Sequence, residues 1–324
     1  MIDFPSQDDL TIHFAHPAYQ LDTCLKARNT GIKCFQTRTP EDAKARIAEG
    51  HVVVASGHWN NDFLNTASQL RFVQVCAAGY NQFDLDAVRA ADVRLANASG
   101  VNVNAVSDHA MALMLGLTRQ IHHARDNQRA KHWRGMISDI ARREDELAGK
   151  TVLIIGMGAI GSRLARLAKA FEMTVIGVRR NTAAIEAQVD EAHPPGALPE
   201  LLGRADFVVL TCPLTDETAN IIDAAALSAM QPTAQLINVA RGGCVDQSAL
   251  IDALKSGTII GAGIDTTVQE PLDAASPLWD FDNIILTPHS AGETRRYEEN
   301  VMDILLDNLN RLWRGETALH NQIV

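Results

Sequence analysis

Several features that would assign this chain to a specialised class are missing from its sequence. Its 324 residues include only five cysteines, an odd number without the spacing of metal ligands. Scattered cysteines of this kind are typical of small reduced core residues and argue against a disulfide framework or a zinc site. No apolar run reaches the roughly 18 residues that a membrane-spanning helix needs. We therefore predict no bound metal and no insertion into a membrane.

Basic charge is also scarce. The 29 Lys and Arg residues are outnumbered by 39 Asp and Glu, which gives a formal net charge of −10. Nucleic-acid binders carry a basic surface, so we expect no nucleic-acid partner. A small anionic substrate stays compatible with this charge, because a positive pocket can operate within a negative protein. The first residues, MIDFPSQDDL, are acidic where a secretory signal is basic and then apolar, so we expect a cytoplasmic protein.

Short β-rich runs alternate with helix-like segments along most of the chain, which favours an α/β fold. One series of runs lies between Leu10 and Ser99, and a second begins near Leu147. The runs are almost continuously apolar, as in parallel strands that are covered on both faces. We predict two doubly wound parallel-sheet domains, a long helical segment over 105–133 between the two series, and a last helix over 293–313.

A glycine pattern in the second series predicts a nucleotide site. The run TVLIIGMGAIGSRLARLAKAF combines a strand, the pattern G-x-G-x-x-G and an amphipathic helix. Gly156 permits a tight turn, Gly158 lets a pyrophosphate approach the backbone, and Gly161 lets helix and strand pack closely. The phosphates then lie at the helix N-terminus, where free N–H groups and the helix dipole favour negative charge. The alternative is that the glycines serve packing alone.

The strand that follows ends in Arg179 and Arg180. An acid usually stands there, about 20 residues beyond the glycines, and accepts hydrogen bonds from the adenosine ribose. A carboxylate repels a 2′-phosphate, whereas a guanidinium binds it through paired, charge-assisted hydrogen bonds. The pair therefore predicts that NADP(H) is preferred and that NAD(H) is possible. If both arginines are only solvated at a strand end, the choice of cofactor stays open.

Three later motifs each follow an apolar strand, where ligands gather in open parallel sheets. They are INVARGGCVD with Arg241, DTTVQEPLD with Asp265 and Glu270, and LTPHSAG with His289. Each residue is ambiguous alone, because a single Arg is usually a surface charge and an isolated His is more often structural than catalytic. Together they supply the groups that reduction of a 2-keto acid requires.

These motifs, in this order after the glycine pattern, resemble those of the D-isomer-specific 2-hydroxyacid dehydrogenases over roughly residues 70–292. The resemblance implies a flavodoxin-like substrate-binding domain built from residues 1–100 and 293–324. It also implies a Rossmann NAD(P)-binding domain over 101–292, and a homodimer in which the helical segment 105–133 forms an arm. Trp133 then either reaches a neighbouring subunit or packs within its own chain.

The resemblance also implies catalytic roles. Arg241 is expected to bind the substrate carboxylate and polarise the 2-keto oxygen, a task that suits a permanently charged fork of donors. His289 is expected to donate a proton to that oxygen during reduction and to take it back during oxidation. Glu270 is expected to hold the imidazole and to favour its protonated form.

Further positions match cofactor and substrate contacts of the family. The cofactor set comprises the three motif glycines and the two arginines with Ala159, Ile160, Cys212, Val239, Ala240 and Asp265. In the first series, CAAGYNQFDLDA resembles a loop whose amides hold the substrate carboxylate, so Ala78 and Gly79 are candidates. Asn102 matches a residue near substrate at a hinge. Without the other motifs, AAGYN would be interpreted as an ordinary glycine turn.

Two positions depart from the family pattern. Asp108 stands where the family has Glu, and Arg179 stands where NAD-preferring members have Asp. The arginine pair together with AAGYN resembles the NADPH-dependent glyoxylate and hydroxypyruvate reductases. His58 and Trp59 either border the substrate or pack the surface, so substrate size stays open. The alternative function is a non-catalytic NADP(H)-sensing protein on the same fold.

Overall fold

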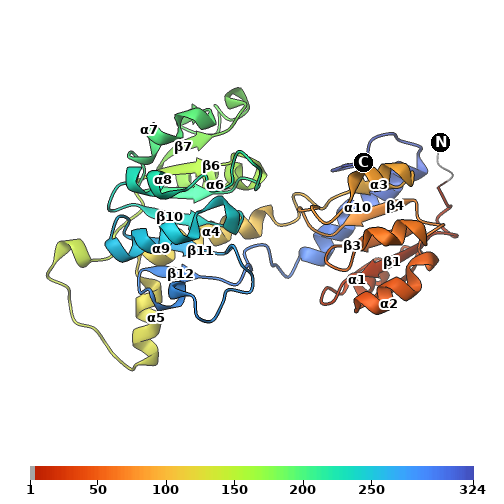
Figure 1. Cartoon of the computed structure of the whole chain (residues 1–324), viewed down its shortest axis with the longest axis horizontal. Coiled ribbons are helices and arrows are strands. Elements are labelled where there is room, and N and C mark those ends of the chain that lie inside the picture. The colour runs from red at the N-terminus through yellow and green to blue at the C-terminus, as the bar shows by residue number, and fades with distance from the viewer. Residues whose placement is uncertain (1–3) are drawn as a thin grey trace. The chain divides into compact units, whose positions relative to one another are not determined.

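The computed structural model describes residues 4–324, which form two compact α/β units (Figure 1). Unit 1 comprises the chain up to Asn102 together with Thr294–Val324, and unit 2 comprises Val103–Glu293. The boundaries expected from the sequence lie within two residues of these. Each unit contains one sheet with parallel strands, so the predicted fold class of two parallel-sheet domains is confirmed.

Unit 1 has a five-stranded sheet in the order β2-β1-β3-β4-β5, the flavodoxin-like order. Successive side chains point to opposite faces, and both faces are apolar. Ile12 and Phe14 of β1 lie in one core with α1 and α10, whereas the alternating Val53 and Ala55 of β3 lie in the other. The strands are β1 (Thr11–Ala15), β2 (Lys33–Thr37), β3 (Val52–Ala55), β4 (Phe72–Val75) and β5 (Arg94–Ala96), and the helices are α1 (Leu21–Ala27), α2 (Pro40–Arg46), α3 (Leu85–Ala90) and α10 (Tyr297–Trp313).

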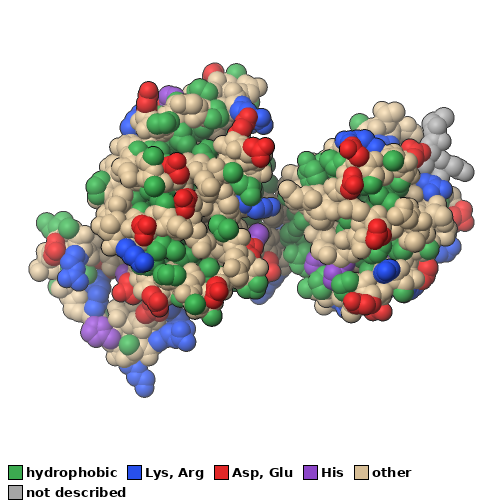
Figure 2. Space-filling model, in the orientation of Figure 1, with side chains coloured by type: hydrophobic (Ala, Val, Ile, Leu, Met, Phe, Trp, Pro, Cys, Tyr) green, Lys and Arg blue, Asp and Glu red, His purple; other side chains and the backbone are tan. Residues whose placement is uncertain are grey.

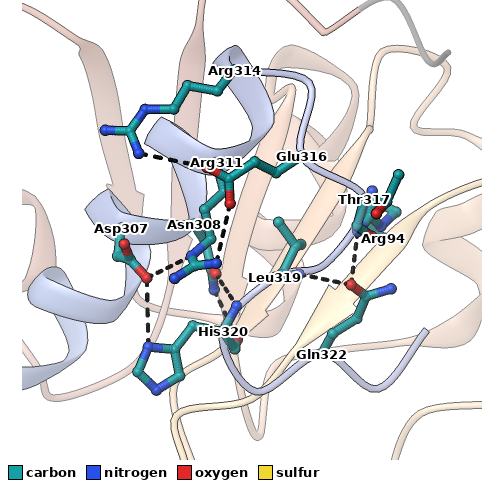
Figure 3. A network of polar contacts seen from close by, with 10 residues as sticks. All are labelled: Arg94, Asp307, Asn308, Arg311, Arg314, Glu316, Thr317, Leu319, His320 and Gln322. Carbon is teal, nitrogen blue, oxygen red and sulfur yellow. Dashed lines mark hydrogen bonds and ion pairs between the residues drawn. The ribbon is translucent and has the colours of Figure 1, made fainter.

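The last residues of the chain cover the free edge of β5 in unit 1. Ala96 and Gln322 form an antiparallel bridge, and the Leu95 amide donates to the Val324 carbonyl at 3.1 Å. Figure 3 shows how polar side chains of α10 and β5 meet this tail: Asn308 of α10 accepts from the His320 amide at 2.7 Å, and Arg94 of β5 donates to the Gln322 side chain at 2.7 Å. An edge strand that is paired in this way offers no template for association with other strands.

Unit 2 has a seven-stranded sheet in the order β12-β11-β10-β9-β6-β7-β8. Read from β8, this is the Rossmann order 3-2-1-4-5-6 with one further strand. The short β8 was not expected from the sequence, because its three residues Glu191–His193 lack an apolar pattern. The other strands are β6 (Thr151–Ile155), β7 (Thr174–Val178), β9 (Phe207–Leu210), β10 (Gln235–Asn238), β11 (Gly261–Ile264) and β12 (Ile284–Leu286).

The helices of unit 2 correct one expectation. The segment 105–133 is not one helix, because α4 (Val103–Thr118) ends before Gln120, whose φ of 51° lies in the left-handed region. The shorter α5 (Ile121–Arg129) then starts in a new direction, and Trp133 lies beyond it. The remaining helices are α6 (Ala159–Ala170), α7 (Leu198–Leu202), α8 (Ala224–Ala229) and α9 (Gln247–Ser256).

Residues 121–143, called the arm below, project from the body of unit 2 in Figure 1. Figure 2 shows Lys, Arg and His side chains gathered over this segment. Large apolar side chains are also exposed there, with Trp133 97% and Met136 101% accessible. Solvent-exposed side chains of this size over one short segment are typical of a surface that meets another protein.

None of the helices within residues 4–324 combines the length and the hydropathy that crossing a membrane requires. Across the same residues, no cluster of three His, Cys, Asp or Glu side chains could hold a metal ion.

Candidate active site

The three motif glycines occupy three different environments between β6 and α6. Gly156 has a φ of 102°, and a Cβ there would lie 2.4 Å from the Cys212 amide nitrogen. A Cβ at Gly161 would lie 2.5 Å from the Gly156 carbonyl oxygen, whereas one at Gly158 would meet nothing within 4 Å. Gly156 and Gly161 are therefore required by the turn and by packing, and Gly158 leaves open space above the backbone.

That open space lies at the N-terminus of α6. Gly158 is the N-cap residue, and no side chain caps the free amides of the first turn, which include those of Ala159 and Ile160. Amides that point outward beside an open backbone suit a phosphate group. The residues at this turn fit a dinucleotide pyrophosphate.

Arg179 and Arg180, at the end of β7, differ in their surroundings. The Arg179 guanidinium donates from Nη1 to the Met157 carbonyl at 2.9 Å, so it lies against the glycine turn. The Arg180 side chain is 83% exposed, and its nearest acid is Glu217 at 3.9 Å. Arg179 is therefore held against the glycine turn, while Arg180 is a solvated cation beside it.

The other predicted nucleotide contacts are largely buried. Cys212, Val239 and Ala240 are each less than a tenth exposed. The hydrogen bond with Cys244, together with burial, raises the pKa of the Cys212 thiol, so this sulfur stays protonated. These residues can border a nucleotide mainly through their backbone, as the contact between Gly156 and the Cys212 amide illustrates.

Arg241, Glu270 and His289 follow three neighbouring strands. β10, β11 and β12 pair in parallel, and Arg241, Glu270 and His289 come after their respective carboxyl ends. The carboxyl ends of parallel strands meet at one edge of the sheet, where ligands bind in this class of fold.

His289 and Glu270 are in direct contact. The Nδ1 atom of His289 lies 2.7 Å from Oε2 of Glu270, and the two side chains are 45% and 39% exposed. The other carboxylate oxygen of Glu270, Oε1, accepts from the Thr267 amide at 3.1 Å. Because a carboxylate only accepts hydrogen bonds, Nδ1 carries a proton and Nε2 is free to exchange one with a substrate.

The loop that carries Arg241 is fixed by two neighbours. The buried Asn238 side chain accepts from the Ala240 amide at 3.0 Å and donates to the Arg241 carbonyl at 3.0 Å. A Cβ at Gly242 would lie 2.0 Å from the Thr267 carbonyl carbon, so the Arg241 loop packs directly on the backbone before Glu270. The exposed guanidinium uses Nη1 to reach the Ala240 carbonyl at 2.6 Å, which leaves most of its donors available.

Asp265 is buried, and its carboxylate organises the His289 loop. Oδ1 accepts from the Thr287 hydroxyl at 2.6 Å and from the Ser290 amide at 2.9 Å, and Oδ2 accepts from the Ala291 amide at 3.1 Å. The side chain is about 1% exposed. The sequence predicted a cofactor contact here, which stays a prediction; the hydrogen bonds that the carboxylate accepts come from the His289 loop.

Several residues at the site were not singled out from the sequence. They include Asn238, Thr287 and His109, whose Nε2 lies 2.9 Å from the Thr287 hydroxyl oxygen. Only Asn238 had a visible signal, as a polar residue at the end of an apolar strand. The departure at Asp108 also has a structural account, because its carboxylate forms an ion pair with Arg163 of α6 at 2.6 Å.

In unit 1, Ala78 and Gly79 lie in the loop after β4. The buried Asn97 side chain donates to the Ala78 carbonyl at 2.7 Å, which fixes the loop. Among the described residues, neither the Ala78 nor the Gly79 amide donates a hydrogen bond to the protein. Asn102 is the last residue of this part of unit 1. The two amides are therefore available to an anion.

Two other loops of unit 1 bear on substrate size. Trp59 is 8% exposed and stacks on Phe83, so it packs the core and does not border open space. His58 follows β3, and His16 follows the neighbouring β1. Burial, aided by the nearby His58, lowers the pKa of His16 from the ordinary 6.5 to about 4, so His16 is neutral near pH 7.

Comparisons with known proteins agree with this geometry. Residues 111–291 match the family model of the D-isomer specific 2-hydroxyacid dehydrogenase NAD binding domain. A glyoxylate/hydroxypyruvate reductase B of Pectobacterium carotovorum subsp. carotovorum is 36% identical over 271 residues, which cover 83% of this chain and 83% of that protein. A glyoxylate reductase of Pyrococcus furiosus is 35% identical over 289 residues, covering 87% and 85%.

The fold is also similar to solved structures. A D-isomer specific 2-hydroxyacid dehydrogenase family protein from Aeromonas salmonicida subsp. salmonicida superposes with a TM-score of 0.84 at 29% identity. The superposition covers 98% of this chain and 99% of that chain.

Proposed function

Since this chain belongs to the D-isomer specific 2-hydroxyacid dehydrogenase family, we propose that it reduces a small 2-keto acid to the D-2-hydroxy acid. The substrate is of the glyoxylate or hydroxypyruvate type, and NADPH is the preferred hydride donor. The substrate class is supported by the curated relatives that are glyoxylate and hydroxypyruvate reductases at 35–36% identity. The observation that carries the chemistry is the 2.7 Å contact between His289 Nδ1 and Glu270.

His289 acts as the general acid. Glu270 holds the Nδ1 proton, so the imidazole presents Nε2 to the 2-keto oxygen. Proton donation to the oxygen accompanies hydride addition at the carbon, and the same imidazole takes the proton back in the oxidative direction.

Arg241 binds the substrate carboxylate and polarises the keto group. Its loop is fixed by Asn238 and Gly242, and most of its donors are available. In unit 1, the free amides of Ala78 and Gly79 bind the substrate carboxylate, and Asn102 lies near the substrate. The family resemblance implies these roles, and the local geometry of each residue is compatible with its role.

The nicotinamide cofactor is held by the glycine turn and the start of α6. Gly158 offers the open backbone, the amides of Ala159 and Ile160 bind the pyrophosphate, and Asp265 keeps its neighbouring loop in place. When bound, the cofactor supplies the hydride. Arg179 binds a 2′-phosphate, because its guanidinium is held against the turn by Met157.

The chain forms a homodimer through the arm. Ile121, Trp133, Met136 and Ile140 are between 57% and 101% exposed, and a second copy would cover them. We also place the enzyme in the cytoplasm, in keeping with five cysteines that are all free thiols. Sedimentation of the wild type and of Trp133→Ala tests the assembly, and a wild-type monomer at micromolar concentration would contradict it.

The test of cofactor choice compares NADPH with NADH in the reduction of hydroxypyruvate and glyoxylate. We expect kcat/KM to favour NADPH by tenfold or more, equivalent to about 1.4 kcal/mol. Arg179→Ala should remove most of that margin. Arg180→Ala is the matched control and should remove less, because its side chain is solvated.

Each outcome of this test has a distinct meaning. Equal use of NADH by the wild type would contradict the assignment of Arg179 to a 2′-phosphate. It would not count against the proposed reduction of a 2-keto acid. Tight NADPH binding without turnover of any 2-keto acid would instead support the non-catalytic sensing alternative.

A further inference from the structure

His109 is joined to the His289 loop by a chain of hydrogen bonds. It lies on α4, and its Nε2 is 2.9 Å from Oγ1 of Thr287. The same hydroxyl lies 2.6 Å from Oδ1 of Asp265. This hydrogen-bond chain thus joins His109 to Thr287, which is 178 residues later in the sequence and two positions before His289.

The chemistry of the three groups fixes the direction of this chain. A carboxylate accepts hydrogen bonds and donates none, so the single hydroxyl proton of Thr287 points to Asp265. The Thr287 oxygen can then only accept from His109, which requires a proton on Nε2. If His109 carried its proton on Nδ1 instead, Nε2 and the Thr287 oxygen would be two acceptors facing one another. If the Thr287 hydroxyl turned its proton to Nε2, the buried Asp265 carboxylate would lose a donor.

Asp265 carries the effect of this chain to the catalytic histidine. Its carbonyl accepts from the His289 amide at 2.8 Å, and its carboxylate accepts from the Ser290 amide. His289 has a φ of 53°, an uncommon conformation for a residue with a side chain. Such a conformation persists only where the surrounding structure over-determines it. The Thr287 and Asp265 contacts supply that constraint, and His109 is their link to α4.

The start of α4 is itself fixed within unit 2. Arg163 of α6 donates to the Ser107 hydroxyl at 2.5 Å and to the Asp108 carboxylate at 2.6 Å. His109 therefore directly follows two residues of α4, Ser107 and Asp108, that Arg163 holds in place. Supporting side chains on rigid elements can hold a catalytic group within a fraction of an ångström.

We propose that His109 is a positioning residue for proton transfer, which acts through Thr287 and Asp265 to orient His289 for the reaction. This inference rests on the proposed reduction of a 2-keto acid, and it adds a residue that acts through the protein's own hydrogen bonds. A residue of purely structural function would affect stability, whereas a positioning residue affects the chemical step.

The kinetic test uses two pairs of variants. His109→Leu and Thr287→Val break the hydrogen-bond chain. In contrast, His109→Gln keeps a donor and Thr287→Ser keeps a hydroxyl at the same place. We expect the breaking variants to lower kcat with hydroxypyruvate about 10- to 100-fold, as small misplacements of catalytic groups do. The KM for NADPH should stay within about twofold, and the conserving variants should retain most of the wild-type kcat.

Two further readouts separate positioning from loss of structure. With deuterated NADPH, the breaking variants should show a larger isotope effect on kcat, because a misaligned proton donor makes the chemical step more rate-limiting. The matched control is Thr118→Val, which removes another buried hydroxyl from α4, one that bonds the Met114 carbonyl at 2.7 Å. It should lose stability similarly and keep its kcat and isotope effect.

The inference is overturned if His109→Leu has wild-type kcat, if His109→Gln is as slow as His109→Leu, or if Thr118→Val loses kcat equally. A readout without turnover tests the chain directly. In ¹⁵N-histidine spectra, assigned by difference from His109→Gln, His109 should carry its proton on Nε2, and a proton on Nδ1 alone would overturn the directional chain. Failure of the wild type to reduce any 2-keto acid would count against the proposed function, while the spectra would still report on the chain.

Discussion

The two units share a parallel-sheet plan, but their polar side chains serve different purposes. In unit 2, Glu270 and His289 are about half exposed at the ends of their strands. In unit 1, the buried polar side chains Gln74, Asn308 and His13 lie inside the packing, and Asn308 ties α10 to the C-terminal tail (Figure 3). Polar groups that face solvent at a sheet edge can be lost with little damage to the fold, whereas buried ones cannot. Substitution of Glu270 or His289 should therefore slow the reaction, whereas substitution of the buried polar side chains of unit 1 should destabilise the protein.

The largest effect should come from His289→Asn. Asn tolerates the left-handed backbone conformation at this position, so the substitution removes the acid without straining the loop. We expect kcat for the 2-keto acid to fall about 10²- to 10⁴-fold, the range for loss of a general acid. Urea unfolding should change by less than about 0.5 kcal/mol, because the side chain is half exposed.

Glu270→Gln should sharpen the same comparison through the hydrogen bond to His289. The amide nitrogen of Gln can face Nδ1, so this side chain no longer requires the tautomer that presents Nε2 to the substrate. We expect kcat to fall about 10- to 100-fold, while urea unfolding changes by less than about 0.5 kcal/mol. A variant with wild-type kcat, or with a large loss of stability, would contradict this comparison.

In unit 1, Asn308→Ala should change stability instead. The Asn308 side chain donates to Gln74 at 2.9 Å and accepts from the His320 amide at 2.7 Å, and it is fully buried. Its removal leaves buried polar groups without partners, at about 1–3 kcal/mol each, so we expect a loss of about 3 kcal/mol. Asn310→Ala, on the exposed side of the same helix, is the control and should be nearly neutral. A variant with wild-type stability but reduced kcat would contradict the comparison.

The sequence predicted local features better than contacts between distant segments, for a physical reason. The glycine turn depends on local steric requirements, and Gly156, Gly158 and Gly161 each fit the environment that their spacing predicted. The placement of Arg241 and His289 just beyond the ends of β10 and β12 was also indicated by the apolar runs that precede them. Contacts between distant segments left no local pattern, so neither the bond from His109 to Thr287 nor the bond from Asn308 to Gln74 could be anticipated.

Local geometry also overrode one regular pattern. The helical periodicity over 105–133 gave no sign of a break, yet Gln120 adopts a left-handed conformation and α5 starts anew after it. The arm that results carries exposed apolar side chains, and the proposed dimer contact rests on these rather than on the helical periodicity.

The smallest of the predicted effects concerns His13, a buried histidine of unit 1 that takes no part in the chemistry. Its Nε2 contacts the Thr37 hydroxyl at 2.7 Å, and within the described residues its Nδ1 has no partner. Burial, aided by Arg46 and opposed by Glu49, lowers its pKa from the ordinary 6.5 to about 4. The folded protein therefore keeps this imidazole neutral at a pH where the unfolded chain takes up a proton.

The sign of the resulting pH dependence follows from that difference. Between pH 6.5 and about 4 the unfolded state binds more protons, so stability falls as the pH drops through this window. From pH 7.5 to pH 5, His13 should account for a loss of about 2 kcal/mol in the free energy of unfolding. In His13→Leu the pH-dependent loss should be smaller by that amount, whereas the exposed His132→Leu should behave as the wild type. Urea unfolding at the two pH values measures both, and an unchanged slope in His13→Leu would show that this imidazole is solvated or paired in the folded protein.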